Sequence, residues 1–345
     1  MQLKSAQNES ALTDVAKIIS HVDHKWGYKI RGHEIHQTKR NMERLSLRER
    51  ANLVSSFCSK NNIEYLTYHV PILRNEGLSL SDERSLEKTN NYVLTTISEA
   101  DIVYKQSGLR NNVTIIYHLP SVIGCNEIPY LNRELKFKIL CNAESSFIKL
   151  YMTNSSNFKS FCTMTVENVF PKYFANDMSY ATINMFHPFE MIRMRKYGIK
   201  VTLDLSHYQI YSNYMLYGKG NQVGDLDRQI YGTLTPSWKD CIDLLGSSLI
   251  QLHINDGKGI DSLGEGLFPT EGEIPIQEIL QYIRYSKESI SYDKESQIPD
   301  KTLFPTTNDE AIQATIELRD GHLHNGETQR KAANWLLAST GEVFY

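Results

Sequence analysis

Short runs rich in β-branched and aromatic residues alternate along this chain with longer amphipathic stretches. The runs predict strands at 63–70, 112–119, 161–169, 200–205, 248–254 and 312–318, with a weaker one at 28–36. The amphipathic stretches predict helices at about 10–24, 46–61, 80–107, 131–153, 186–198, 236–246, 275–286 and 327–338. Strands that are separated by helices pair in parallel through helical crossovers rather than as hairpins. The alternation therefore predicts an α/β fold with a parallel sheet.

A parallel sheet of this size forms either a TIM (β/α)8-type barrel or a doubly wound open sheet. The chain has 345 residues, which suits a single barrel, since such barrels span about 200 to over 400 residues. No Gly-x-Gly-x-x-Gly or P-loop segment follows a predicted strand, which disfavours the open sheet. We predict one barrel domain over 1–345, with a polar inserted loop at about 285–310. Its first strand is either Met1–Lys4 or absent.

Charge and cysteine content narrow the class of protein. The net charge is -3 and the isoelectric point is about 6.4, so nucleic acid is not favoured as the main partner, although it is not excluded. The five cysteines are scattered and form no Cys-x-x-Cys pair, which argues against disulfides and a cysteine zinc site. No apolar run approaches the roughly 18 residues of a membrane span. We expect a cytoplasmic protein with a small-molecule substrate and no membrane contact, and an oligomer remains open.

Potential metal ligands stand at the carboxyl ends of the predicted strands, where barrels carry their active sites. They are His69, His118, Glu167, Asp204, His253 and Glu317. Glu167 and Glu317 interrupt apolar strands, where an unpaired carboxylate is costly to bury. Imidazole and carboxylate ligands suit Zn²⁺, Mn²⁺ or Fe²⁺. We predict one divalent metal on Glu167, Asp204, His253 and Glu317, and a second site on His69 and His118 with Glu167 bridging.

Other polar residues near these strand ends receive supporting roles. Asn168 and Asp256 are expected to orient the ligands or contact the substrate, and His207 and Lys258 to position its hydroxyl or anionic groups. Glu34 reaches the site if its weak strand is real. The remaining histidines are expected to be exposed residues of helices or loops: His21, His24, His33, His36, His187, His322 and His324.

Four segments in this order resemble the xylose isomerase-like TIM-barrel superfamily, which joins endonuclease IV-type enzymes (AP endonuclease family 2) to sugar isomerases and epimerases. They are TVEN at 165–168, LDLSH at 203–207, LHIND at 252–256 followed by LGEG at 263–266, and IELR at 316–319. The similarity extends from about residue 10 to 340. In the sugar branch it implies that Glu167 and Glu317 hold the metal and exchange protons with the substrate, while His207 binds a sugar oxygen. In the endonuclease IV branch it implies that His69 and His118 join a cluster of zinc ions.

The sequence departs from both branches. The endonuclease IV branch expects an Asp-x-His pair between HIND and LGEG, where this chain has GKGIDS. Ketose epimerases commonly have an arginine shortly after the strand-seven histidine; here Lys258 is the candidate replacement. We predict a metal-dependent isomerase or epimerase that acts on a sugar-like polyhydroxy carbonyl compound through an enediolate, with Glu167 and Glu317 as base and acid. The alternatives are an endonuclease IV-like hydrolase acting on abasic DNA and a non-catalytic ligand-binding barrel.

Overall fold

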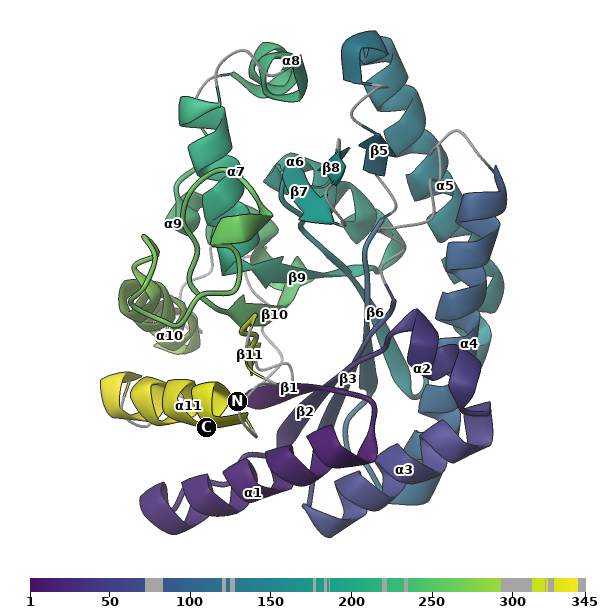
Figure 1. Ribbon diagram of the computed structural model, residues 1–345, viewed down its shortest axis with the longest axis vertical. Coiled ribbons are helices and arrows are strands. Elements are labelled where there is room, and N and C mark those ends of the chain that lie inside the picture. The colour runs from purple at the N-terminus through teal and green to yellow at the C-terminus, as the bar shows by residue number, and fades with distance from the viewer. Residues whose placement is uncertain are drawn as a thin grey trace.

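Eight parallel strands close into a barrel in the computed structural model (Figure 1). The structure describes residues 1–71, 83–119, 122–124, 128–175, 178–182, 185, 187–218, 222–232, 235–292, 312–319, 321 and 326–340. Around the barrel the strands are β1 (Gln2–Ala6), β2 (Gly32–His36), β3 (Tyr65–His69), β4 (Val113–Tyr117), β6 (Cys162–Glu167), β9 (Lys200–Asp204), β10 (Leu249–Ile254) and β11 (Gln313–Ile316). The predicted TIM-type barrel is confirmed.

The strand β1 closes the barrel, because it pairs in parallel with both β2 and β11. Leu3 lies opposite His33 on one side and Ile316 on the other. The first strand is therefore present, and it extends to Ala6, two residues past the predicted segment. Two parts of the chain more than 300 residues apart thus become neighbours.

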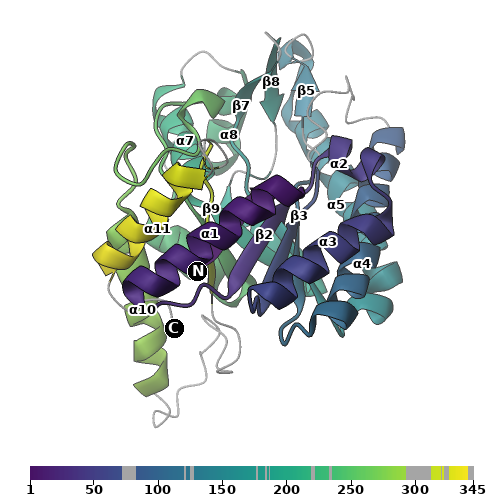
Figure 2. The same ribbon diagram turned by 60° about the horizontal axis from the view of Figure 1, so that its bottom comes forward.

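Helices pack around the outside of the barrel (Figures 1 and 2). They are α1 (Glu9–Trp26), α2 (Lys39–Arg44), α3 (Leu47–Lys60), α4 (Glu83–Ser107), α5 (Arg133–Phe158), α6 (Pro188–Ile192), α7 (Leu205–Tyr217), α8 (Gln222–Tyr231), α9 (Trp238–Leu245), α10 (Ile276–Tyr292) and α11 (Glu327–Thr340). Among the described helices, none is both long enough and apolar enough to cross a membrane.

Several elements differ from the predicted ones. The helix expected at 186–198 divides into α6 and a 3-10 helix, Arg193–Tyr197. The helices α2, α7 and α8 were not predicted. Most residues of α7 are buried, so it lacks the alternation of polar and apolar faces that marks a surface helix. A small antiparallel sheet, β5 (Val122–Gly124), β7 (Lys172–Ala175) and β8 (Met178–Thr182), was also missed; Figure 2 shows it at one end of the barrel.

The predicted inserted loop at about 285–310 begins inside a helix. The helix α10 continues to Tyr292, six residues past its predicted end. The rest of the predicted insertion, 293–310, lies outside the described residues. The single domain over 1–345 stays a prediction.

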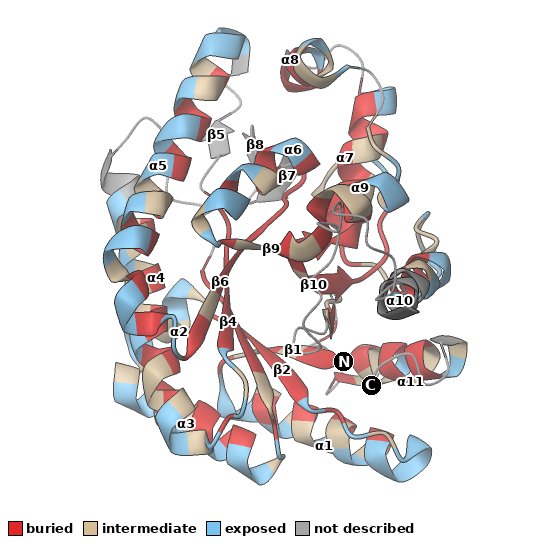
Figure 3. Ribbon diagram, turned by 180° about the vertical axis from the view of Figure 1, so that it is seen from behind, coloured by how far each residue is buried: buried red, intermediate tan, exposed pale blue. Residues whose placement is uncertain are grey.

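The barrel separates an apolar layer from a polar lumen. Side chains such as Leu66, Val113 and Leu252 are buried in the layer between strands and helices. Figure 3 shows that the strands are buried and that the surrounding helices expose their outer faces. Alternate residues of each strand point into the lumen. Gln251 Nε2 of β10 donates across the lumen to Glu34 Oε2 of β2 at 2.8 Å. The lumen therefore holds ionised and hydrogen-bonded side chains below the carboxyl ends of the strands.

Candidate metal centre

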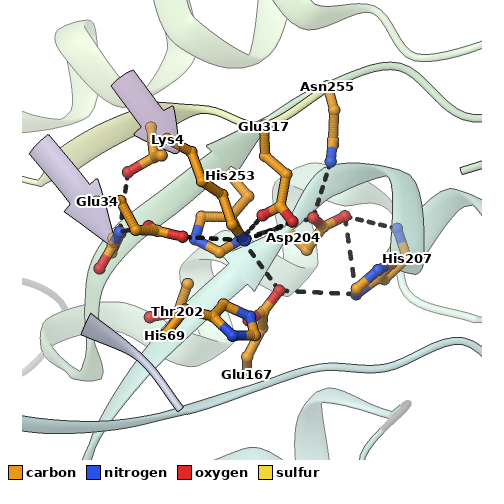
Figure 4. Close-up of polar contacts among 12 residues, drawn as sticks. Lys4, Glu34, His69, Glu167, Thr202, Asp204, His207, His253, Asn255 and Glu317 are labelled. Atoms are coloured by element: carbon orange, nitrogen blue, oxygen red, sulfur yellow. Dashed lines mark hydrogen bonds and ion pairs between the residues drawn. The ribbon is translucent and has the colours of Figure 1, made fainter. Parts of the chain in front are cut away.

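The structure brings together the six predicted ligands. Since the strands are parallel, their carboxyl ends lie at the same end of the barrel. Two groups result, one of His69, His118 and Glu167 and the other of Glu167, Asp204, His253 and Glu317, and within each group the possible ligand atoms lie within 4.8 Å of one another. Figure 4 shows most of these side chains converging. Metal binding by them stays a prediction.

Glu167 belongs to both groups. Its Oε2 atom accepts hydrogen bonds from Nε2 of His69 at 3.1 Å and Nε2 of His118 at 2.7 Å, and its Oε1 atom lies 3.0 Å from Nδ1 of His253. The residue is completely buried. Burial alone raises the pKa of the Glu167 carboxyl, but the neighbouring His253 and His118 outweigh it and hold the pKa well below its usual value. An ionised carboxylate is the form that binds a cation.

Asp204 is held in place by residues of two neighbouring segments. Asn168 accepts a hydrogen bond from the Asp204 backbone N–H at 2.7 Å and donates one to its carbonyl at 2.9 Å. The Asp204 carboxylate caps α7 by accepting from the His207 N–H at 2.8 Å. Its other oxygen accepts from Nδ2 of Asn255 at 2.8 Å. Asn168 was predicted from the sequence, whereas Asn255, which lies within the LHIND segment, was missed.

We expect Asn255→Ala to destabilise the protein by about 1–3 kcal/mol, because two buried polar groups would lose a partner. Asn255 is fully buried, and it also accepts the backbone N–H of Ser206 at 3.1 Å. Urea unfolding of the metal-free protein measures the effect. A matched control is Gln209→Ala, whose hydrogen bonds lie nearer the surface and whose expected cost is within about 0.5 kcal/mol. Equal stability of the two variants would contradict this role of Asn255.

Two charged residues of the first strands complete the centre. Nζ of Lys4 lies 2.5 Å from Oε1 of Glu317 and 3.0 Å from Oε1 of Glu34. Burial alone lowers the pKa of Lys4, but Glu317 and Glu34 outweigh it and raise this pKa. In the same way, burial raises the pKa of Glu317, and Lys4 and His253 bring it well below its usual value. Lys4 was missed from the sequence, and Glu34 was named only conditionally.

The donor set fits a divalent cation. Four carboxylates and one lysine meet in this part of the described structure: Glu34, Glu167, Asp204, Glu317 and Lys4. An excess of buried negative charge is costly unless a cation balances it. Burial alone lowers the pKa of His253, but Glu34, Glu167 and Glu317 outweigh it and raise this pKa well above its usual value. Oε2 of Glu317 lies 2.5 Å from Nδ1 of His253 but makes no well-directed hydrogen bond. This oxygen therefore faces the other ligand atoms without a hydrogen-bond donor, as an oxygen that binds a cation would.

A cavity of about 280 Å³ opens above the centre. Its wall includes His69, His118, His207 and Glu317, and also the segment 36–39 and Glu265. Nδ1 of His207 donates to the Asn168 carbonyl at 2.8 Å, and its Nε2 lies 3.3 Å from Oε1 of Glu265. Burial lowers the pKa of His207, but Asp204 and Glu265 outweigh it and raise it to about 10. Because Nδ1 is bound to the Asn168 carbonyl, Nε2 is the nitrogen that His207 presents to the cavity.

Asp256 and Lys258, which were predicted to contact the substrate, lie in the loop after β10. The Asp256 carboxylate accepts backbone N–H groups of Gly257, Thr270 and Ile274 at 2.8–3.0 Å and so holds this loop. Lys258 is exposed, and its Nζ lies 3.3 Å from the Glu271 carbonyl. Neither belongs to the cavity wall formed by the described residues. Their substrate contacts stay predictions.

Four of the histidines expected to be exposed are buried or partly buried, and that expectation was wrong for them: His33, His36, His187 and His21. His33 is buried in β2, with Nε2 3.0 Å from Ser5 Oγ. His36 ends β2, is partly buried and borders the cavity, with its ring centroid 5.0 Å from that of His69. His187 is buried and caps α6. The reason for the first two is that the weak predicted strand is a full barrel strand between β1 and β3.

Both histidines of α1 belong to that set. His21 is partly buried, whereas His24 is exposed as expected. His322 and His324 lie outside the described residues.

Comparison with solved structures supports the barrel fold. No protein-family model matches the sequence, and a search of curated proteins found no match either. Among solved structures, the chain is similar to the IOLI protein with a bound zinc atom, at 13% identity over 100% of this chain and 99% of that one, with a TM-score of 0.54. It is also similar to L-ribulose 3-epimerase, at 11% identity over 99% and 95% of the two chains, with a TM-score of 0.53.

A third similar structure is the TTHB071 protein from Thermus thermophilus soaked with ZnCl2, at 13% identity over 99% of this chain and 98% of that one, with a TM-score of 0.50. At these identities the similarity concerns the fold. The chain shares a barrel fold with these structures, as the sequence predicted.

Proposed function

We propose that this protein is a divalent-metal-dependent enzyme whose centre is formed by Glu167, Asp204, His253 and Glu317. The observation that carries the proposal is the grouping of these four residues, with their ligand atoms within 4.8 Å of one another, below a cavity that Glu317 borders. Nitrogen and carboxylate ligands without cysteine suit an open catalytic site. Zinc is the first candidate, since two proteins of similar fold are described with zinc; manganese and iron(II) suit the same ligands.

We propose isomerisation or epimerisation of a sugar or sugar-like polyhydroxy carbonyl compound as the reaction. The cavity of about 280 Å³ is close to the lower limit of about 300 Å³ for small-molecule sites, which favours a small substrate. L-ribulose 3-epimerase, a protein of the same fold, supports this class. When bound, the metal would supply Lewis-acid stabilisation of the negative charge that develops on the substrate oxygen.

The two glutamates differ in their access to a substrate. The side chain of Glu317 is 22% exposed and borders the cavity, whereas that of Glu167 is 1% exposed. We assign Glu317 the removal of the proton next to the carbonyl group. Glu167 is proposed as the second proton-transfer group. In this role it must break one of its hydrogen bonds with His69, His118 or His253. His207, which also borders the cavity, is proposed to bind a substrate hydroxyl.

A specific observation favours a second candidate function. His69 and His118 share the carboxylate of Glu167 with the first group, and sugar isomerisation with one metal does not require them. Two metals a few ångströms apart are the arrangement that hydrolyses phosphodiesters by stabilising both the attacking and the leaving oxygen. A hydrolase with two metals, of the endonuclease IV type, is therefore the alternative.

Solvent deuterium exchange tests the proposal directly. The wild-type protein is purified without chelators, analysed for metal, loaded with zinc, and incubated in deuterium oxide with a panel of ketopentoses and ketohexoses. Metal-dependent incorporation of deuterium next to the carbonyl group is the expected result. Cleavage of a duplex that contains an abasic site, without deuterium exchange in any sugar, would move the assignment to the hydrolase. Sugar binding without either reaction would indicate a non-catalytic barrel.

A further inference from the structure

The two ring nitrogens of His253 face different surroundings. Nδ1 points to the proposed metal ligands, at 3.0 Å from Oε1 of Glu167 and 3.6 Å from Oδ2 of Asp204. Nε2 points to the other side, 3.0 Å from Oε2 of Glu34 (Figure 4). The ring is fully buried, so water does not compete for either nitrogen. An ionised carboxylate only accepts hydrogen bonds, so the contact with Glu34 needs a proton on Nε2. Nδ1, which faces Glu167, is then the nitrogen that would bind the cation in place of its own proton.

Glu34 is itself held by three groups from two other strands, β1 and β10. Besides His253, Nε2 of Gln251 donates to Oε2 of Glu34 at 2.8 Å, and Nζ of Lys4 pairs with its Oε1 at 3.0 Å. Lys4 and Glu34 are direct partners in the register of β1 and β2. Glu34 is fully buried, so these contacts within the lumen hold it without competition from water. The carboxylate orientation is therefore defined by the barrel strands.

Lys4 also links this carboxylate to a proposed metal ligand. Its Nζ atom lies 2.5 Å from Oε1 of Glu317, while Oε2 of that residue is directed to Nδ1 of His253. One lysine thus holds the outer oxygen of Glu317 and leaves the inner oxygen for the cation. The side chain of Lys4 is only 10% exposed, so its position is determined by these two carboxylates.

We infer that Lys4 and Glu34 are positioning residues of the metal centre. Glu34 selects the nitrogen of His253 that faces the metal, and Lys4 orients Glu317 and balances part of the negative charge. The inference rests on the metal centre of the proposed function, but it is independent of the reaction that this centre catalyses. Residues that orient metal ligands in this way typically contribute about 10- to 100-fold to metal affinity.

The double variant Lys4→Met with Glu34→Leu tests the inference. It removes one positive and one negative charge, so the formal charge near the metal stays the same and a change in affinity reports orientation. Replacing both members of a buried ion pair by apolar residues is often tolerated by the fold. A matched control is Lys136→Met with Asp227→Leu, which removes a buried pair between α5 and α8. Zinc affinity is measured by competition with a chromophoric chelator, beside thermal unfolding of the metal-free proteins.

The Lys4/Glu34 variant should bind zinc about 10- to 100-fold more weakly than the wild type, while the control variant binds zinc as the wild type does. Wild-type affinity in the Lys4/Glu34 variant would overturn the inference and leave the metal centre intact. A wild-type protein that binds no zinc, manganese or iron would instead contradict the proposed metal centre, and with it the inference.

If the double variant does not fold, nitrogen-15 NMR of the zinc-loaded wild type decides the question. The expected spectrum has Nε2 of His253 protonated and Nδ1 bound to zinc. The opposite assignment of the two nitrogens would overturn the role of Glu34.

Discussion

Glu167→Gln is expected to abolish tight metal binding at both ligand groups. Glu167 is the residue that the two groups share, and its two carboxylate oxygens contact His69, His118 and His253 at 2.7–3.1 Å. A carboxamide has one acceptor oxygen, so its NH2 group would face either the histidine pair or His253. The loss of affinity should exceed the roughly 10- to 100-fold cost of losing a residue that only orients a ligand.

Metal content per chain after dialysis against metal-free buffer measures this effect. The matched control is Glu144→Gln, a buried carboxylate on α5 that pairs with Arg193 at 3.0 Å, and this variant should retain the metal content of the wild type. Full metal occupancy in Glu167→Gln would contradict the proposed centre, because Glu167 is the residue through which the first group bridges to the second.

Glu317→Gln is expected to slow deuterium exchange into the substrate by about 10²- to 10⁴-fold, the usual contribution of a general acid or base. Glu317 borders the cavity, and Lys4 keeps its carboxylate ionised. The rate is compared at saturating zinc and per bound metal, because Glu317 is also a proposed ligand. Glu64→Gln serves as control, since Glu64 pairs with Arg31 at 3.3 Å on the surface. Undiminished exchange in a metal-loaded Glu317→Gln protein would remove Glu317 from the proton-transfer step.

The positions of the proposed ligands were accessible to sequence reasoning because they depend on local patterns. An apolar strand that ends in histidine or a carboxylate is visible in the residue order, as at His69, Glu167 and Asp204. The parallel arrangement then follows from the helices between the strands, and it places all such ends together. The weak strand at 28–36 misled this reasoning. Its polar residues His33, Glu34 and His36 resemble those of an exposed segment, yet β2 pairs with β1 on one edge and with β3 on the other.

The sequence by itself determined seven of the eight barrel strands, most of the helices between them, the barrel class and the residues at the strand ends. Only the tertiary structure decided that Lys4 meets Glu317, which lies 313 positions away in the chain, and that Glu34 reaches across the lumen to His253. The physical reason is that such contacts depend on the closure of β1 against β11 and on the register between strands. A shift of one residue would turn each side chain from the lumen to the outer layer, and no local pattern in the chain specifies that register.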